Sequence, residues 1–559
     1  LHDVLRDELD GVFAGVHLLP FYPPIDGSDA GFDPSDHTAV DPRLGGWNDV
    51  GRIGAEHRVM ADLIVNHISC DSPQFRDWQA RGVDSPYDGM FLTRDTVFPN
   101  GATDDELDAI YRPRPWPPFT SYEVAGVKRE IWTTFNGEQV DLDVHHPAAW
   151  AYLMSVLDRF AAAGIDLVRL DAIGYAIKKP GTTCFMIPEC FEFIDELTAA
   201  ARGRGMDVLV EIHSHHRFQM DVAGRVDRVY DFALPPLVLY ALHHGDAAPL
   251  ADWLAIAPRN CVTVLDTHDG IGVVDVAPEG DQPGLLGAEQ VDALVGAIHE
   301  ASGRTSLEAT GSAATNLDIY QVNCTYYEAL GRDDAAHFLA RLLQVLTPGI
   351  PQIYYGGLLA APNQMDLLAR TDVGRDINRP YYDAETRAAV ALAGFAVLIL
   401  TIGLGAAPWI SLVLAVTFGT YGVLKKQVAT GPIVSVTAEV LVLAPIAVVW
   451  LAVFSTSGLP DLATWALLVM TGPMTAGPLI LFSYGAKRIR LATAGLLNYL
   501  NPTLQFLCAV TVLSEPFFLT HMIAFPLIWL ALAMYSWSAI AQDRAARMAS
   551  ARDVTSGTV

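Results

Sequence analysis

The stretch GIDLVRLDA, at residues 164–172, is a short apolar run that closes on an acid, Asp171. Two further runs share this pattern: DVLVEIHS at 207–214, where Glu211 follows the apolar residues, and CVTVLDTHD at 261–269, which ends in Asp269. Such near-continuous Val, Ile and Leu is typical of a strand buried on both faces of a parallel sheet. A carboxylate just past such a strand lies at the C-terminal rim, where (β/α) barrels carry out chemistry. The three acids therefore predict one active site at the C-terminal ends of the strands.

Seven runs of this kind alternate with helical patterns between residues 12 and 357, which predicts an α/β fold with a parallel sheet or barrel. Besides the three above, they are GVHLLPFY (15–22), VMADLIVNH (59–67), RVYDFALP (228–235) and GIPQIYYGG (349–357). Helical patterns at 148–164 and 190–205 lie between them, and each ends on glycine. Eight strands would close a barrel of the (β/α)8 type.

Two irregular stretches interrupt this alternation. The first, from about 68 to 140, contains RPRPWPPFTSY (112–122) and is too long for an ordinary connection between a strand and a helix. It predicts a subdomain inserted over the rim. The second, from 277 to about 327, predicts lid loops for substrate binding.

Composition divides the chain of 559 residues into two chemically different parts. From position 385 onward there are nine Lys and Arg against six Asp and Glu, a net charge of +3, so the first part carries −30 against −27 for the whole chain. An acidic surface argues against a nucleic-acid partner. The six cysteines are scattered without metal-ligand spacing, which favours reduced thiols over disulfides or zinc. We expect a catalytic part at 1–384 and a second domain at 385–547, followed by a tail at 548–559.

The second domain consists of long apolar segments, several of them long enough to cross a lipid bilayer as helices. They lie at about 389–405, 408–424, 432–454, 462–484, 491–513 and 517–540. In a six-span arrangement the lysines and arginines of the loops and the tail fall on one side, which is the cytoplasmic side by the positive-inside rule. The expected location is therefore the inner (plasma) membrane, multi-pass, with the catalytic part and the tail in the cytoplasm.

The acids at the strand ends suit the cleavage of a glycosidic bond, which needs a proton donor and a second carboxylate that attacks the sugar carbon. Arg169 lies two residues before Asp171 and so shares its face of the strand, where it would keep that carboxylate ionised. His67 and His268 could hold sugar hydroxyls. The histidines of EIHSHH, at 211–216, point to alternate faces of a strand, so neither a metal nor a cofactor is expected.

Residues 1 to about 382 resemble glycoside hydrolase family 13, the alpha-amylase family, and within it the sucrose phosphorylase subfamily. The resemblance is carried by LLPFYPPIDGSDAGFDPSDHTAVDPRLG, ADLIVNH, NGATDDELDAIYRPRP, VRLDAIGYAIKKPGTTCFMIPE, VLVEIHS, VDRVYDFALPPLVLYAL, TVLDTHDGIGV, NLDIYQVNCTYY and GRDINR. It implies a (β/α)8-type barrel that here lacks its first strand and the family's small C-terminal β domain.

The same resemblance implies phosphorolysis of sucrose, or of a related glucoside, by inorganic phosphate through a glucosyl ester. Asp171 would be the nucleophile, Glu211 the general acid and base, and Asp269 the stabiliser of the transition state. The glucose subsite would be lined by Asp29, Phe32, His67, Arg169, His268 and Arg375. The loops that bear Arg112, Arg114, Tyr320 and Gln321 would meet the acceptor, with Arg114 as the expected phosphate ligand.

The segment from about 388 to 547 resembles the C-terminal half of a RarD-type transporter of the EamA drug/metabolite superfamily. This resemblance is carried by VTFGTYGVLKK, TAEVLVLAPIAVVWL, GPLILFSYGAKRIRLATAGLLNYLNPTLQFLCAV and SEPF. Glu439, an acid well inside a predicted span, is the transport candidate. Full members contain two inverted repeats, so a homodimer could supply the missing one. Three alternatives stay open: a tethered enzyme, half a transporter with an inactive catalytic remnant, or a chimeric product of two genes.

Overall fold

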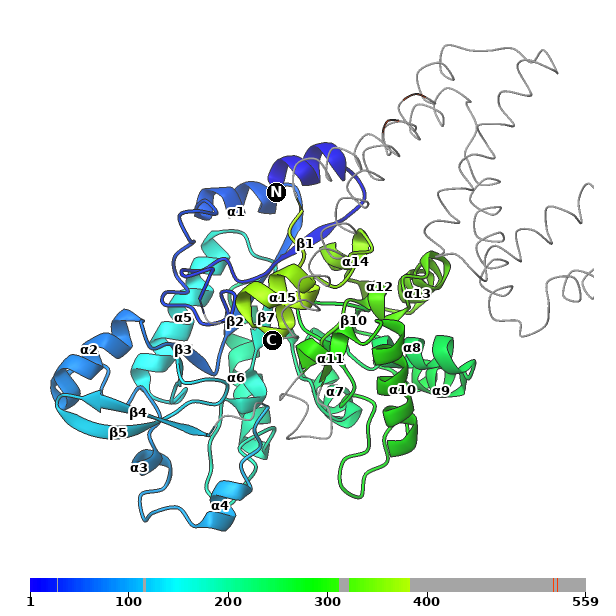
Figure 1. The fold of residues 1–559 in the computed structure, drawn as a ribbon. Helices are drawn as coiled ribbons and strands as arrows, with labels where there is room; N and C mark the ends of the chain where they lie inside the picture. The colour runs from blue at the N-terminus through cyan, green and yellow to red at the C-terminus, as the bar shows by residue number, and fades with distance from the viewer. Residues whose placement is uncertain (28, 114–116, 311–320, 383–525, 527–529, 531–559) are drawn as a thin grey trace, which may run out of the picture. The chain divides into compact units, whose positions relative to one another are not determined.

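The computed structural model describes residues 1–27, 29–113, 117–310 and 321–382, together with 526 and 530 (Figure 1). Two compact units can be distinguished by their internal contacts. The first comprises residues 1–329, 343–359 and 367–378; the described part of the second comprises 330–342, 360–366 and 379–382, with 526 and 530. The main sheet lies in the first unit.

Seven parallel strands form the main sheet, in the order β1–β2–β7–β8–β9–β10–β13. Their bounds are β1 Gly15–Leu18, β2 Arg58–Ile64, β7 Leu167–Asp171, β8 Asp207–Val210, β9 Arg228–Asp231, β10 Cys261–Thr263 and β13 Ile350–Pro351. Each of the seven predicted runs contributes one strand, so the prediction of a parallel α/β sheet is confirmed. Among the described residues, β1 and β13 are the two edges of this sheet. The arrangement is a curled parallel sheet, a half-barrel consistent with the (β/α) barrel architecture.

Helices follow the strands and cover the sheet (Figure 1). The helical segments of the described residues are η1 Val4–Glu8, α1 Trp47–Gly54, α2 Pro73–Arg81, η2 Gly82–Asp84, α3 Arg94–Val97, α4 Asp104–Asp108, α5 Pro147–Ala162, η3 Ile173–Tyr175, α6 Pro188–Arg202, α7 His216–Ala223, α8 Leu234–His244, α9 Ala248–Ile256, α10 Ala288–Ala301, α11 Thr305–Thr310, α12 Tyr326–Ala329, α13 Asp334–Leu346, α14 Tyr355–Leu358, α15 Met365–Thr371 and η5 Gly374–Asn378. The predicted helices at 148–164 and 190–205 are α5 and α6.

Local sequence explains why α5 forms where it does. Its first residue is Pro147, whose missing N–H costs nothing at a helix start, and the side chain of His146 caps the Ala148 amide at 3.2 Å. Val156, Leu157 and Phe160 share one face and are buried in the core. After the helix ends, the chain turns at Gly164 with φ +75°, a conformation that favours glycine.

Strand register sets which side chains meet at the rim. Asp62 of β2 pairs with Arg169 of β7, and Ile64 pairs with Asp171, the last residue of β7. On the other side of β7, Leu170 pairs with Val210, so Glu211 follows immediately at the same level. Neighbouring parallel strands thus carry Asp171 and Glu211 to one end of the sheet.

The long insertion between β2 and β7 has secondary structure of its own. Its two ends are joined by an antiparallel pair, β3 His67–Ser69 with β6 Gln139–Asp141. Between them lie α2, α3, α4 and the hairpin of β4 Phe119–Val124 and β5 Val127–Trp132, which Figure 1 shows gathered beside the sheet. The pairing of β3 with β6 also fixes His67 at the mouth of the insertion.

The stretch from 277 to about 327 was predicted to be irregular, and for residues 288–301 this prediction was wrong, while the expectation of lid loops stays a prediction. Residues 288–301 form α10, which buries Val291, Leu294, Val295 and Ile298. That spacing is the period of an amphipathic helix and is visible in the sequence. α11 Thr305–Thr310 and β12 Gln321–Val322 also lie in this stretch, and β12 pairs with β11 Ile271–Gly272.

Within the ranges that the structure describes, no helix has both the length and the apolar character needed to span a bilayer. The six predicted spans lie outside the described residues, apart from positions 526 and 530. Both they and the transporter resemblance stay predictions. Among the described cysteines, Cys70, Cys184, Cys190 and Cys261 carry free thiols.

Candidate active site

The three predicted acids meet at one end of the main sheet. Asp171 ends β7, Glu211 follows the last residue of β8, and Asp269 lies in the loop between β10 and β11. All three line one cavity of about 590 Å³. Its walls are formed by Asp29, Phe32, His67, Phe135, Asp171, Ala172, Gly174, Tyr175, Phe185, Glu211, Ile212, His213, His268, Asp269 and Arg375. The structure thus brings together most of the site residues that the sequence singled out.

Arg169 lies beneath the floor of this cavity and is itself buried. Its Nη1 atom donates to Asp171 Oδ1 at 2.7 Å and also to Asp62 Oδ1, while its Nη2 lies 3.4 Å from Glu211 Oε1. One guanidinium therefore serves three carboxylates. This is the ion pair with Asp171 that the sequence predicted, extended to two further acids.

The crowding of acids around one cation determines where a proton can sit. Burial, and then the charges of Glu211 and Asp62, raise the pKa of Asp171, while Arg169 acts in the opposite direction. Three carboxylates around one guanidinium repel one another, so the cluster disfavours full ionisation. The Nη1 atom of Arg169 lies 2.7 Å from Asp171 and Nη2 lies 3.4 Å from Glu211, so the ion pair with Asp171 is the closer of the two. Two carboxyl groups at neighbouring strand ends are the pair that glycosyl transfer needs.

Asp62 is a supporting residue that the sequence reasoning missed. It is fully buried on β2 and is also in contact with His17 of β1, whose Nε2 lies 2.8 Å from Asp62 Oδ2. Burial alone would raise its pKa, but the charges of Arg169 and His17 outweigh burial and lower the pKa of Asp62 to about 2. The available signal was an acid inside the otherwise apolar run VMADLIVNH.

One wall of the cavity is a stacked aromatic pair. The rings of Phe32 and His268 lie 4.6 Å apart and are nearly parallel, at 6°. His67 donates from Nε2 to the Phe32 carbonyl at 3.0 Å, and burial lowers the pKa of His67, which favours the neutral ring. A flat apolar face beside fixed polar groups suits a sugar ring, whose faces are apolar and whose edge carries hydroxyls.

Asp269 and Arg375 also line the cavity, and Asp269 Oδ2 lies 3.7 Å from His268 Nε2. Arg375 Nη1 lies 2.7 Å from Asp269 Oδ1 and 3.7 Å from Asp29 Oδ1. The backbone of this loop is also held, because Asn378 Nδ2 donates to the Asp269 carbonyl at 2.7 Å. Arg375 therefore links Asp29 and Asp269 into one polar group beside the stacked pair.

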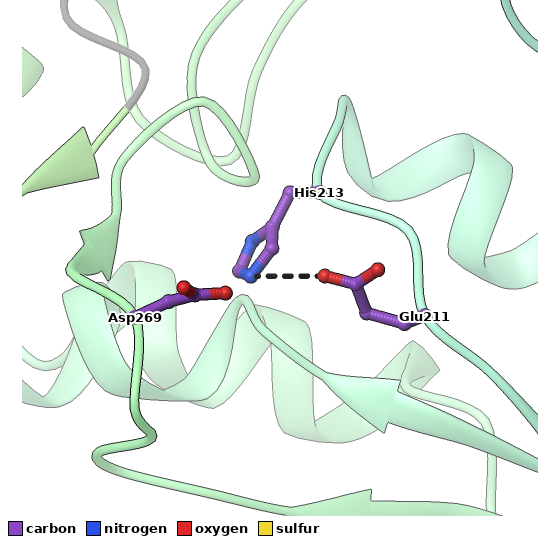
Figure 2. Close-up of side chains that lie close together, drawn as sticks. All are labelled: Glu211, His213 and Asp269. Carbon is purple, nitrogen blue, oxygen red and sulfur yellow. Dashed lines mark ion pairs between the residues drawn. The ribbon is translucent and has the colours of Figure 1, made fainter. Parts of the chain in front are cut away.

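His213 enters the same cavity, although the sequence reasoning considered it only as a metal ligand and set that role aside. Figure 2 shows its ring between Glu211 and Asp269, and Nε2 lies 3.9 Å from Glu211 Oε1. Donor atoms of these three residues lie within 4.8 Å of one another, a grouping that could accept a cation. Two guanidinium groups already meet the same carboxylates, however: Arg375 at Asp269 and Arg169 at Glu211. That the site uses no metal and no cofactor stays a prediction.

Only two of the four residues predicted to meet the acceptor, Arg112 and Gln321, lie in the described part of the chain. Gln321 accepts a hydrogen bond from the Gly270 amide at 2.6 Å, so its side chain supports the loop that carries Asp269 and is not part of the cavity wall. Arg112 lines a separate hollow of about 230 Å³ with Trp132 and Lys178. Arg114, Tyr320 and the transport candidate Glu439 lie outside the described residues.

Three aromatic residues of the cavity were also missed. Tyr175 lies close to both Phe135 and Phe185, with ring centroids 5.1 Å and 4.6 Å away. They come from the insertion and from the loop after β7, segments without a periodic pattern. Their grouping therefore depends on the tertiary fold and leaves no signal in the sequence.

Comparison with known proteins agrees with this arrangement. Residues 11–223 match the family model "Alpha amylase, catalytic domain". A sucrose phosphorylase from Agrobacterium vitis is 55% identical over 385 residues, which cover 68% of this chain and 79% of the relative. Another, from Bifidobacterium adolescentis, is 52% identical over 383 residues, or 68% and 76% of the two chains. The crystal structure of a sucrose 6F-phosphate phosphorylase from Thermoanaerobacter thermosaccharolyticum superimposes with a TM-score of 0.62 at 36% identity, covering 68% and 77%.

Proposed function

Because this chain belongs to the sucrose phosphorylase group of the alpha-amylase family, we propose that it transfers the glucosyl unit of sucrose to inorganic phosphate. The products are α-glucose 1-phosphate and fructose. The observation that carries the proposal is the single guanidinium of Arg169 shared by Asp171, Glu211 and Asp62, which holds Asp171 and Glu211 side by side at one end of the sheet.

In the first step, an Asp171 oxygen attacks the anomeric carbon of glucose while Glu211 gives its proton to the departing oxygen of fructose. The bond to fructose breaks, and a glucosyl ester of Asp171 forms with inverted configuration. In the second step, Glu211 takes the proton of hydrogen phosphate while a phosphate oxygen attacks the same carbon, the ester bond breaks, and Asp171 is released as a carboxylate. Two inversions give retention.

Other cavity residues bind and orient glucose in this scheme. Asp269 and Arg375 accept and donate hydrogen bonds at the hydroxyl edge, and the Phe32–His268 pair covers one face of the ring. Charged groups that are already held in place stabilise the developing positive charge without rearranging. His67, neutral and fixed by the Phe32 carbonyl, is a further hydroxyl partner.

Sucrose is favoured over phosphorylated donors by the level of similarity. The two sucrose phosphorylases are 55% and 52% identical to this chain, and the sucrose 6F-phosphate phosphorylase is 36% identical. Residues that meet the acceptor decide between such substrates, since the acids at the strand ends serve every member.

We also propose that the apolar segment from about 388 to 547 anchors the chain in the plasma membrane, with the catalytic part in the cytoplasm. The support for this proposal is the composition of the segment and the distribution of its basic residues. Anchoring of this kind involves no residue of the catalytic cavity.

Release of glucose 1-phosphate from sucrose by the full chain, purified in detergent, tests the enzyme proposal. We expect release that depends on phosphate, and a loss of about a hundredfold or more in Glu211→Gln, which cannot donate the proton. Glu300→Gln, at a side chain that is 70% exposed, is the matched control and should keep wild-type activity. A folded wild-type chain that released no product would refute the proposal and favour an inactive remnant.

A further inference from the structure

A buried acid outside the cavity wall lies directly behind His213. Asp275 is 1% exposed and follows β11 by three residues. His213 Nδ1 donates to Asp275 Oδ2 at 3.0 Å, and the Ser214 amide donates to Asp275 Oδ1 at 3.3 Å. Both oxygens of one carboxylate are therefore engaged by the segment that carries His213.

Gly272 makes this contact possible. A Cβ at that position would collide with Asp275 Oδ2 and would lie 3.0 Å from His213 Nδ1, the two atoms of the hydrogen bond. The other face of the imidazole is also fixed, because it stacks on Phe232 with a centroid distance of 3.7 Å and an angle of 18°. The ring thus has one orientation, with Nδ1 toward Asp275 and Nε2 toward Glu211 and Asp269 (Figure 2).

This environment favours a positively charged ring. Burial alone would lower the pKa of His213, but the charges of Asp275, Glu211 and Asp269, with the hydrogen bond to Asp275, outweigh it and raise the pKa. Among the described residues, these three carboxylates act on the imidazole from the segments that follow β8, β11 and β10. A carboxylate that accepts from one ring nitrogen also fixes which nitrogen points into the site.

A positively charged His213 would reduce the repulsion that phosphate meets from the carboxylates of the site in the second half-reaction. Once Asp171 is esterified its charge is gone, but Glu211, having lost its proton, and Asp269 remain as anions where phosphate must enter. Like charges a few Å apart repel strongly in a cavity of low dielectric. In the described part of the site, Arg375 is shared by Asp269 and Asp29, and Arg169 is shared by Asp171, Asp62 and, at 3.4 Å, Glu211. Two guanidinium groups thus serve five carboxylates.

We propose that Asp275 is a positioning residue that holds His213 as an imidazolium facing Glu211 and Asp269, and so lets phosphate, rather than water, take the glucosyl unit. The inference rests on the proposed function. Asp275 touches neither substrate nor the reacting atoms; it acts through His213. Its role is acceptor selectivity, so the first step and attack by neutral acceptors do not depend on its charge.

Asp275→Asn in the full chain tests this role. The asparagine keeps the shape but cannot support a charged ring, because one of its two terminal atoms is an N–H donor. We expect the KM for phosphate to rise about tenfold, as when a charge-assisted hydrogen bond is replaced by a neutral one. Hydrolysis of sucrose without phosphate should change by less than about threefold, because water carries no charge.

Asp231→Asn is the matched control. Asp231 is also 1% exposed and ends β9, but its Oδ1 accepts from the Trp253 indole at 2.9 Å and from the Leu234 amide at 3.0 Å, bonds that an asparagine oxygen keeps. This control should leave the KM for phosphate unchanged. Thermal unfolding of both variants checks that each is folded.

A second measurement separates positioning from a structural effect. In a His213→Gln background, Asp275→Asn should cause no further rise in the KM for phosphate, because the two residues act as one unit. In Asp275→Asn the imidazole of His213 should lose its proton at a lower pH than in the wild type. The ratio of glucose 1-phosphate to glucose should therefore begin to fall at a lower pH than it does in the wild type. Gly272→Ala, which forces the pair apart, should show the same selective loss.

Two results would overturn the inference: an unchanged KM for phosphate in a folded Asp275→Asn protein, or an equal loss of hydrolysis and phosphorolysis. Both require a wild-type chain that makes glucose 1-phosphate. A wild-type chain without that activity would instead refute the proposed function, so the two failures are distinguishable.

Discussion

Arg169→Lys is expected to lower kcat/KM for sucrose by about thirty- to a hundredfold. Arg169 contacts three acids from two different nitrogens: Nη1 meets Asp171 at 2.7 Å as well as Asp62, and Nη2 lies 3.4 Å from Glu211. A single ammonium on a shorter side chain cannot occupy both positions. At least one charge-assisted hydrogen bond is lost, worth about 2–3 kcal/mol in the transition state, and this energy converts to that factor.

The same substitution should move the pH dependence in a definite direction. Burial already raises the pKa of Asp171, and Arg169 is the group that opposes this rise. With a weaker cation the pKa rises further, so less of the nucleophile is ionised at a given pH. Activity grows as Asp171 loses its proton, and the acid limb of the kcat/KM profile should therefore move to higher pH in Arg169→Lys.

Initial rates of glucose 1-phosphate release across the pH range, with the full chain, measure both effects. Arg202→Lys is the matched control, because Arg202 pairs with Asp227 at 2.9 Å on the surface and its side chain is 47% exposed. An exposed pair contributes about 0.5 kcal/mol, so this variant should behave as wild type. A folded Arg169→Lys protein with wild-type kcat/KM and an unshifted acid limb would refute the assignment of Arg169.

Two further predictions concern stability and location. His37 is fully buried between Tyr152 and the Ile64 amide, and burial lowers its pKa from 6.5 to about 3. His37 therefore binds a proton less readily in the folded state than in the unfolded chain. Its contribution to the free energy of unfolding is complete above pH 6.5 and falls by about 2 kcal/mol on going to pH 5. Thermal unfolding of His37→Gln should show a flatter dependence between these values; equal slopes would contradict the explanation. The proposed anchor predicts that the full chain stays with membranes after alkaline carbonate extraction and is released by detergent, while recovery in the carbonate supernatant would exclude it.

Much of the architecture could be predicted because it depends on local patterns. Seven apolar runs gave seven strands, and the acids that close three of them share one cavity, since parallel strands end at one rim. The missed α10 was an error of interpretation: Val291, Leu294, Val295 and Ile298 have helical spacing in the sequence. Asp62 also left a signal, as an acid in a buried strand.

Other parts of the site have no local signature. Asp62 and Arg169 are 107 residues apart, and His213 and Asp275 are 62 apart, so only the packed barrel makes them partners. Likewise the pocket's Phe135, Tyr175 and Phe185 come from segments without periodicity.

By itself, the sequence determined the strand pattern, the acids at the rim and the resemblance to one family, because short-range periodicity encodes burial. The tertiary structure decided which charges are shared, which way His213 faces and where Gly272 leaves room. Those properties depend on distances of a few Å between segments far apart in the chain, and electrostatic and steric energies change steeply over such distances.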